Sequence, residues 1–300
     1  MCTAFKLRNC MGRNFDYEIS YGEQLIEIPR DNETINNHYS IIGIVSGQIP
    51  MYPMFYDGLN DHGLCMAGLN FDGNAVYHNK DDNKENIKPY EMIPYVLGNY
   101  KSVDDVKKWA ENINILDEPF SENIPNSPLH WFVCDKEKSI VIESRANGLY
   151  VHDNPYNVLT NNPYFEAMSV IYEFDKKKIS AENFIHNFLT NNDVEKFFDS
   201  RGKNTFGIKG DYTSIGRFEK CAFLNEYMST QNKFDSITES FHLLSSVEQI
   251  YGLTPVKDKF EYTIYSTVYN MDSLEVCVQN YDKSYLKYGF ADMEYRIPLV

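Results

Sequence analysis

Short apolar segments rich in β-branched and aromatic residues occupy both ends of the chain, and this arrangement constrains its fold most strongly. They are typical of β-strands and comprise residues 3–7, 39–47, 64–71, 130–135, 138–144, 260–270 and 273–281. Within 260–270 the side-chain character alternates with a period of two, as in a strand whose faces differ. Residues 135–138 and the pair Met271-Asp272 separate consecutive strands and predict hairpin turns.

Apolar residues recur at helical spacing in the middle of the chain. One predicted helix follows Ser102, a suitable N-cap, and a second follows Ser180. A third runs from Phe241 to Tyr251 and is expected to stop at Gly252. Because strands precede and follow the helices, we expect an α+β protein with antiparallel sheet and outer helices. The sequence contains neither a repeat nor a low-complexity linker, so residues 1–300 are expected to form a single domain.

The charge of the chain excludes several classes of partner. It carries 28 Lys+Arg against 43 Asp+Glu, a formal net charge of −15. Nucleic acids and anionic membrane surfaces both require clustered basic residues, so neither partner is expected. No apolar run is long enough to span a membrane, and residues 1–8 lack the order of a secretory signal. We therefore expect a cytoplasmic protein.

The potential metal ligands are dispersed. The six cysteines form no CxxC motif, so we expect reduced thiols instead of a zinc site or a disulfide framework. The seven histidines form no HxxxH pair. His130 and His152 lie beside predicted strands and are interpreted as structural. No metal and no cofactor are expected.

Cys2 is the exception among the cysteines because it directly follows Met1. Methionine aminopeptidases remove Met1 when the next residue is small, which would leave Cys2 with a free α-amine. That amine could accept the thiol proton and later protonate a leaving amine. The pattern is weak alone, since most chains that begin Met-Cys make no catalytic use of the cysteine. A retained Met1 would block the amine and favour a non-catalytic protein that binds acyl ligands.

A cation and a carboxylate follow Cys2 closely. Arg13 and Asp16 are expected to lie across a short hairpin that turns near Arg8-Asn9. A guanidinium favours a neighbouring thiolate, and a carboxylate would hold an α-ammonium. The alternative is an ordinary surface turn with an Arg–Asp pair.

Several motifs together carry a resemblance to a known family. They are residues 1–3 (MCT), 12–17 (GRNFDY), 57–60 (DGLN), 63–71 (GLCMAGLNF), 157–163 (NVLTNNP) and 210–218 (GDYTSIGRF). In this order the chain resembles the choloylglycine hydrolase family, the bile salt hydrolases and penicillin V acylases of the N-terminal nucleophile (Ntn) hydrolase superfamily. The resemblance implies a four-layer αββα sandwich of two antiparallel sheets, and hydrolysis of a non-peptide amide by an N-terminal cysteine.

The resemblance also implies the roles of individual residues. Cys2 would be nucleophile and base, with Arg13 beside its thiol and Asp16 bonded to its α-amine. An oxyanion hole would form from the Asn70 backbone and the Asn161 side chain, and Arg217 would close the charge network around Cys2. Without the resemblance, Asn161 is explained by a turn and Arg217 by a surface salt bridge. The stretch between Cys2 and Arg13 is shorter than the family's, so a tight first hairpin is expected.

The substrate and the assembly follow from the resemblance less directly. Residues 68–75 look like the bile salt hydrolase version, so conjugated bile salts are the expected substrates, giving free bile acid plus glycine or taurine. Penicillin V acylase remains an alternative, as does an acylase for N-acyl homoserine lactones or fatty amides. Phe15 and Phe55 are expected in the acyl pocket. Residues 191–212 resemble a protruding element through which family members assemble, which predicts a homo-oligomer, a tetramer, with Phe197, Phe198 and Phe206 against a partner; a free loop is the alternative.

Overall fold

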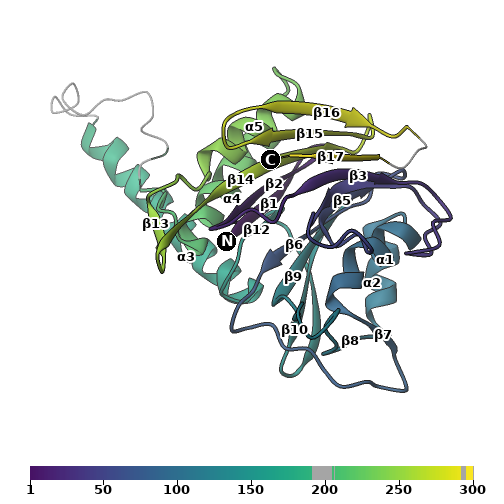
Figure 1. The fold of residues 1–300 in the computed structure, drawn as a ribbon. Helices are drawn as coiled ribbons and strands as arrows, with labels where there is room; N and C mark the ends of the chain where they lie inside the picture. The colour runs from purple at the N-terminus through teal and green to yellow at the C-terminus, as the bar shows by residue number, and fades with distance from the viewer. Residues whose placement is uncertain (191–204, 206, 292–294, 300) are drawn as a thin grey trace.

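Two antiparallel sheets form the centre of the molecule, with helices outside (Figure 1). The computed structural model describes residues 1–190, 205, 207–291 and 295–299. The first sheet has the order β12 (Val158–Leu159), β1 (Cys2–Leu7), β2 (Cys10–Tyr17), β14 (Lys259–Asn270), β15 (Glu275–Asn280) and β16 (Tyr285–Gly289), with β13 (Thr254–Val256) paired to β14.

The second sheet faces the first and is built from strands between residues 24 and 153, together with one strand near the C-terminus. Its order is β11 (Gly148–Asp153), β10 (Ser139–Arg145), β9 (Leu129–Cys134), β6 (Cys65–Asn70), β5 (Phe55–Asn60), β4 (Ile41–Val45), β3 (Gln24–Ile28) and β17 (Tyr295–Pro298). A separate short parallel pair joins β7 (Glu85–Ile87) to β8 (Ile113–Ile115).

Helices cover the outer face of each sheet. α4 (Ser214–Ser229) and α5 (Ser236–Ser246) pack on the first sheet, while the short 3-10 helix η1 (Pro89–Glu91) leads into α1 (Met92–Asn99), which packs on the second with α2 (Val103–Ala110). One apolar core lies between the sheets and beneath α4 and α5, and another lies beneath α1 and α2. The arrangement is a four-layer αββα sandwich, which confirms the predicted α+β fold class.

The predicted strands and the first helix are confirmed. β1 and β2 form a tight hairpin in which Leu7 pairs with Cys10, so the turn is at Arg8-Asn9 as expected. Ser102 caps α2, because its hydroxyl accepts a hydrogen bond from the Asp105 amide at 3.2 Å.

Two helix boundaries were predicted wrongly. α3 (Phe165–Thr190) begins fifteen residues before Ser180, because nothing interrupts the helix there and its Tyr172 packs on Phe218 of α4. α5 ends at Ser246, before the predicted stop at Gly252. The chain leaves the helix because Gln249 bonds instead to Thr263 of β14, through its amide at 2.9 Å and its carbonyl at 3.0 Å.

The predicted assembly segment falls largely outside the described part of the chain. Of residues 191–212, the structure describes 205 and 207–212, so Phe197, Phe198 and Phe206 lie outside the described residues. Among the described residues, no helix has the length and apolar character needed to cross a membrane.

Candidate active site

The pairing of β1 with β2 divides the surroundings of Cys2 into two sides. Cys2 lies opposite Phe15 and Ala4 opposite Arg13, so these side chains share the face that meets the second sheet. Thr3 lies opposite Asn14 and therefore points to the other face, beneath the helices, as does Asp16. The thiol and the carboxylate are thus separated by the pleat of one hairpin.

On the thiol side, Arg13 lies against Cys2. Its Nη2 is 3.5 Å from the Cys2 Sγ and donates to the Gly68 carbonyl at 2.8 Å, while its Nη1 donates to the Tyr265 hydroxyl at 2.6 Å. Arg13 and Cys2 are 1% and 4% exposed. Arg13 therefore places a cation in contact with the Cys2 sulfur at a position shielded from water.

Asp57 holds Arg13 in this position, and it is not among the site residues predicted from the sequence, although it begins the motif of residues 57–60. This fully buried carboxylate on β5 forms a salt bridge with Arg13 across the two sheets. It also accepts hydrogen bonds from Tyr265 at 2.7 Å and from the Tyr269 hydroxyl. Burial, with a smaller contribution from Asp57, raises the pKa of Tyr269 well above its usual value, so that hydroxyl stays a donor. The period-two alternation in β14 places both tyrosines on one face of the strand, and it is the sequence signal that could have indicated this network.

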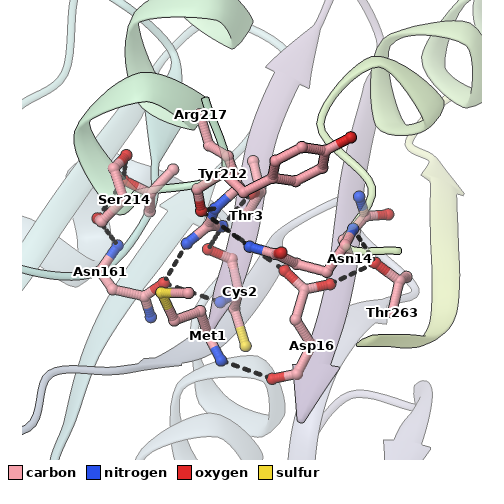
Figure 2. A network of polar contacts seen from close by, with 12 residues as sticks. Met1, Cys2, Thr3, Asn14, Asp16, Asn161, Tyr212, Ser214, Arg217 and Thr263 are labelled. Carbon is pink, nitrogen blue, oxygen red and sulfur yellow. Dashed lines mark hydrogen bonds and ion pairs between the residues drawn. The ribbon is translucent and has the colours of Figure 1, made fainter. Parts of the chain in front are cut away.

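On the helix side, Arg217 reaches the backbone of Cys2 (Figure 2). Thr213 caps α4 by accepting from the Gly216 amide at 3.0 Å, which places Arg217 in the first turn. Its Nη1 donates to the Cys2 carbonyl at 2.7 Å, and its Nη2 donates to the Asn161 Oδ1 at 2.9 Å. Arg217 is 1% exposed, which excludes the surface salt bridge.

Asp16 lies between Arg217 and the start of the chain. One carboxylate oxygen accepts from the Thr263 hydroxyl at 2.6 Å; the other, Oδ2, has no hydrogen-bond partner among the described residues and is 3.6 Å from the Arg217 Nη1. Burial raises the pKa of Asp16 to about 6, although Arg217 and the terminal amine lower it. The Met1 ammonium donates to the Asp16 carbonyl at 2.7 Å and pairs with Glu261 at 2.8 Å.

The Asn161 side chain bonds to the backbone of both Cys2 and Asn70. The Asn161 Oδ1 accepts from the Cys2 amide at 2.8 Å, and its Nδ2 donates to the Asn70 carbonyl at 2.7 Å. The Phe71 amide donates to the Pro128 carbonyl at 2.8 Å. Because hydrogen-bonded and non-hydrogen-bonded pairs alternate along antiparallel strands, the preceding pair, Asn70 with Leu129, exchanges no backbone hydrogen bonds. The Asn70 N–H therefore points away from β9, toward the edge at which its carbonyl meets Asn161.

The structure thus brings together all the residues singled out from the sequence: Cys2, Arg13, Asp16, Asn70, Asn161 and Arg217. A buried thiol beside a cation, with amide donors at its edge, is suited to acyl transfer through a covalent intermediate. Of the two phenylalanines expected in the acyl pocket, Phe15 lies opposite Cys2. Phe55 points instead into the core beneath α1, and the next residue, Tyr56, packs on Phe15 with ring centroids 4.7 Å apart.

One further group brings potential metal ligands together among the described residues. Oxygen or nitrogen atoms of Glu143, His152 and Glu166 lie within 4.8 Å of one another. The Arg145 guanidinium binds both carboxylates, with Nε–Glu143 and Nη1–Glu166 distances of 2.9 Å. The Arg145 guanidinium is therefore the cation that these two carboxylates bind.

Comparisons with known proteins agree with this geometry. Residues 2–289 match the model of the family described as linear amide C–N hydrolases, choloylglycine hydrolase family. The chain is 43% identical to a bile salt hydrolase/transferase of Lactiplantibacillus plantarum over 95% of its own length and 90% of the relative's. It is 36% identical to the Clostridium perfringens bile salt hydrolase/transferase, over 89% and 85% of the two chains.

Solved structures show the same fold. A variant of the conjugated bile acid hydrolase from Clostridium perfringens superposes with a TM-score of 0.86 at 28% identity, covering 100% of this chain and 97% of the other. The penicillin V acylase from Agrobacterium tumefaciens, at 17% identity and a TM-score of 0.74, covers 97% and 86% and shares the fold. The αββα sandwich is therefore the Ntn hydrolase fold. The chain belongs to the choloylglycine hydrolase family and is a linear amide C–N hydrolase.

Proposed function

We propose that the protein cleaves the amide bond of glycine- or taurine-conjugated bile salts, releasing free bile acid and the amino acid. The observation that carries this proposal is the similarity, over nearly the whole chain, to proteins named bile salt hydrolases. The placement of the Cys2 thiol against Arg13 supports the chemistry, because an amidohydrolase of this kind needs an activated nucleophile.

In the proposed reaction, Met1 is removed and Cys2 acts through its thiolate and its α-amine. The thiolate attacks the amide carbon, and the carbonyl oxygen becomes an oxyanion that accepts from the Asn161 side chain and the Asn70 N–H. The α-ammonium gives its proton to the departing nitrogen, the C–N bond breaks, and a thioester remains on Cys2. The α-amine then takes a proton from water, whose oxygen attacks the thioester and frees the bile acid and the thiolate.

The unpartnered oxygen of Asp16 supports its proposed part in this reaction. A buried carboxylate oxygen without a donor is unfavourable, and Oδ2 faces Arg217 without reaching hydrogen-bond distance. The new α-ammonium of Cys2 would supply the missing donor and be held in place. Arg217 would steady the same amine indirectly, since it binds both the Cys2 carbonyl and Asn161.

The substrate is tested by assaying the purified enzyme on glycocholate, taurocholate and penicillin V. We expect hydrolysis of one or both bile salts at a kcat/KM well above that for penicillin V. A reversed preference would assign the enzyme to the penicillin V acylases, and inactivity on all three would favour another amide or a non-catalytic acyl-binding protein. The matched control is Cys2→Ala, which should abolish every activity detected.

We propose that residues 1–300 act as a single unit that assembles into a homo-oligomer, a tetramer, through residues 191–212. Sedimentation measures this directly, and a monomeric mass would contradict it. A cytoplasmic location is supported by six cysteines that are all unpaired and buried.

A further inference from the structure

His130 lies behind both segments that present the proposed oxyanion-hole donors. It is a fully buried residue of β9, paired with Leu69 of β6 on one side and with Glu143 of β10 on the other. Its ring stacks on Phe71, the residue after Asn70, with centroids 4.2 Å apart and planes inclined by 7°. On its other edge, the His130 Nε2 donates to the carbonyl of Thr160, the residue before Asn161, at 2.9 Å.

The second ring nitrogen joins His130 to a buried carboxylate. Its Nδ1 lies 3.2 Å from the Glu143 Oε1, and that oxygen also accepts from the Phe165 amide at 3.1 Å. The other Glu143 oxygen binds Arg145. Burial opposes ionisation of Glu143, but His130 and Arg145 outweigh it and lower the pKa of that carboxyl. Both nitrogens of His130 therefore face oxygen atoms, the Thr160 carbonyl at Nε2 and the Glu143 carboxylate at Nδ1.

His130 and Glu143 together hold both ends of the loop that carries Asn161, an arrangement called the clamp below. His130 holds its start at the Thr160 carbonyl, and Glu143 holds its end at the Phe165 amide. The same imidazole covers Phe71, so one rigid ring is in contact with both walls of the proposed hole. Donors to an oxyanion are effective when they are placed before the reaction, and displacement by about 1 Å can lower a rate about a hundredfold.

We infer that His130 is a positioning residue that keeps Asn70 and Asn161 at the separation needed to bind the oxyanion, through its contacts with Phe71 and Thr160. The inference rests on the proposed function for its oxyanion hole. It does not involve the nucleophile, because Arg13 holds the Cys2 thiol from another strand. Loss of His130 should therefore slow acyl transfer while leaving the thiol as reactive as before.

Three substitutions separate the contacts. His130→Gln can keep a donor at the Nε2 position for Thr160, His130→Asn can keep only the bond to Glu143, and His130→Phe keeps only the stack on Phe71. The control is His62→Gln, a partly exposed histidine that packs on Tyr39. For each we would measure kcat and KM on the best substrate of the panel, and the alkylation rate of Cys2 by iodoacetamide, read on the N-terminal peptide by mass spectrometry.

We expect kcat to fall on the order of 10- to 100-fold in the Asn and Phe variants, and by a smaller factor in the Gln variant, which loses the stack on Phe71 but keeps a donor to Thr160. KM should stay within about threefold and Cys2 alkylation within about twofold in all of them. An unchanged kcat in His130→Asn, or equal kcat in the Gln and Phe variants, would overturn the inference. So would a loss of alkylation that parallels the loss of kcat, because the defect would then extend to the nucleophile.

Two further measurements cover other outcomes. If the His130 variants do not fold, Phe71→Leu removes the stacked ring from the other side and should give the same separation of kcat from alkylation. If no amide in the panel is cleaved, the proposed function fails, and nitrogen-15 NMR of the wild-type histidines still tests the clamp. We expect the His130 Nε2–H to be hydrogen-bonded and protected from exchange with solvent, whereas an Nε2–H that exchanges rapidly would contradict the bond to Thr160.

Discussion

Removal of the Asp57 carboxylate should destabilise the protein far more than removal of a surface charge. Asp57 is fully buried, and Asp57→Ala would leave the Arg13 guanidinium without its counter-ion inside the sandwich. The same change would deprive Tyr265 and Tyr269 of their acceptor. Arg13 would keep its bond to the Gly68 carbonyl at 2.8 Å, which compensates only in part.

The expected loss can be estimated from these contacts. Breaking a buried ion pair by deleting one partner typically destabilises a protein by about 3–5 kcal/mol. The two tyrosine hydroxyls would each add a buried donor without a partner, but contributions within one network are not additive. We therefore expect the free energy of unfolding to fall by about 4–6 kcal/mol in Asp57→Ala, and by less in Asp57→Asn, which keeps an acceptor.

Urea unfolding followed by circular dichroism measures this loss as a shift of the midpoint at constant slope. The matched control is Asp82→Asn, which removes an exposed carboxylate paired with Lys80. It should leave the midpoint unchanged, because exposed ion pairs contribute little. If Asp57→Ala shifts the midpoint no more than this control, the network between the two sheets does not stabilise the fold and the reasoning fails.

Other predictions concern the site and one helix cap. Asn161→Ala should lower kcat by about 10²- to 10³-fold, as for other oxyanion donors, whereas Asn162→Ala should change it little; comparable losses would contradict the assignment. Burial raises the pKa of Asp16 to about 6, so protonation of this carboxyl group stabilises the folded state. That stabilisation is complete below about pH 4 and is lost as the pH rises through about 6. The unfolding free energy of Asp16→Asn relative to wild type should therefore rise between about pH 4 and 6, and a constant difference would refute this. Ser102→Ala should lower the unfolding free energy by about 1 kcal/mol, while Ser102→Asp should retain it; equal stability of the two variants would exclude the cap.

The features that could be predicted from the sequence depend on neighbours along the chain. The hairpin at Arg8-Asn9 follows from two adjacent apolar strands, and the Ser102 cap is a local pattern. The site residues were predicted from dispersed motifs that resemble those of a known family. Composition alone does not indicate that Asn161 and Arg217 meet at Cys2.

The features that could not be predicted depend on residues distant in the sequence. Asp57 meets Tyr265 only because the two sheets pack face to face, and no periodicity within β5 indicates it. α5 ends early because Gln249 finds hydrogen bonds on β14, a tertiary contact that competes with helix formation. Phe55 was expected beside Phe15, but successive residues of a strand face opposite sides, so Tyr56 packs on Phe15 and Phe55 enters the other core.

In the proposed mechanism, Cys2 becomes the N-terminal residue and carries the acyl group during turnover. An acid quench during turnover of glycocholate, followed by intact-mass and N-terminal peptide analysis, tests both parts together. We expect a chain that lacks Met1, with the mass of the cholyl group attached through a thioester to the peptide that begins at Cys2. Hydrolysis by a chain that retains Met1, or an acyl group on any other residue, would contradict the mechanism.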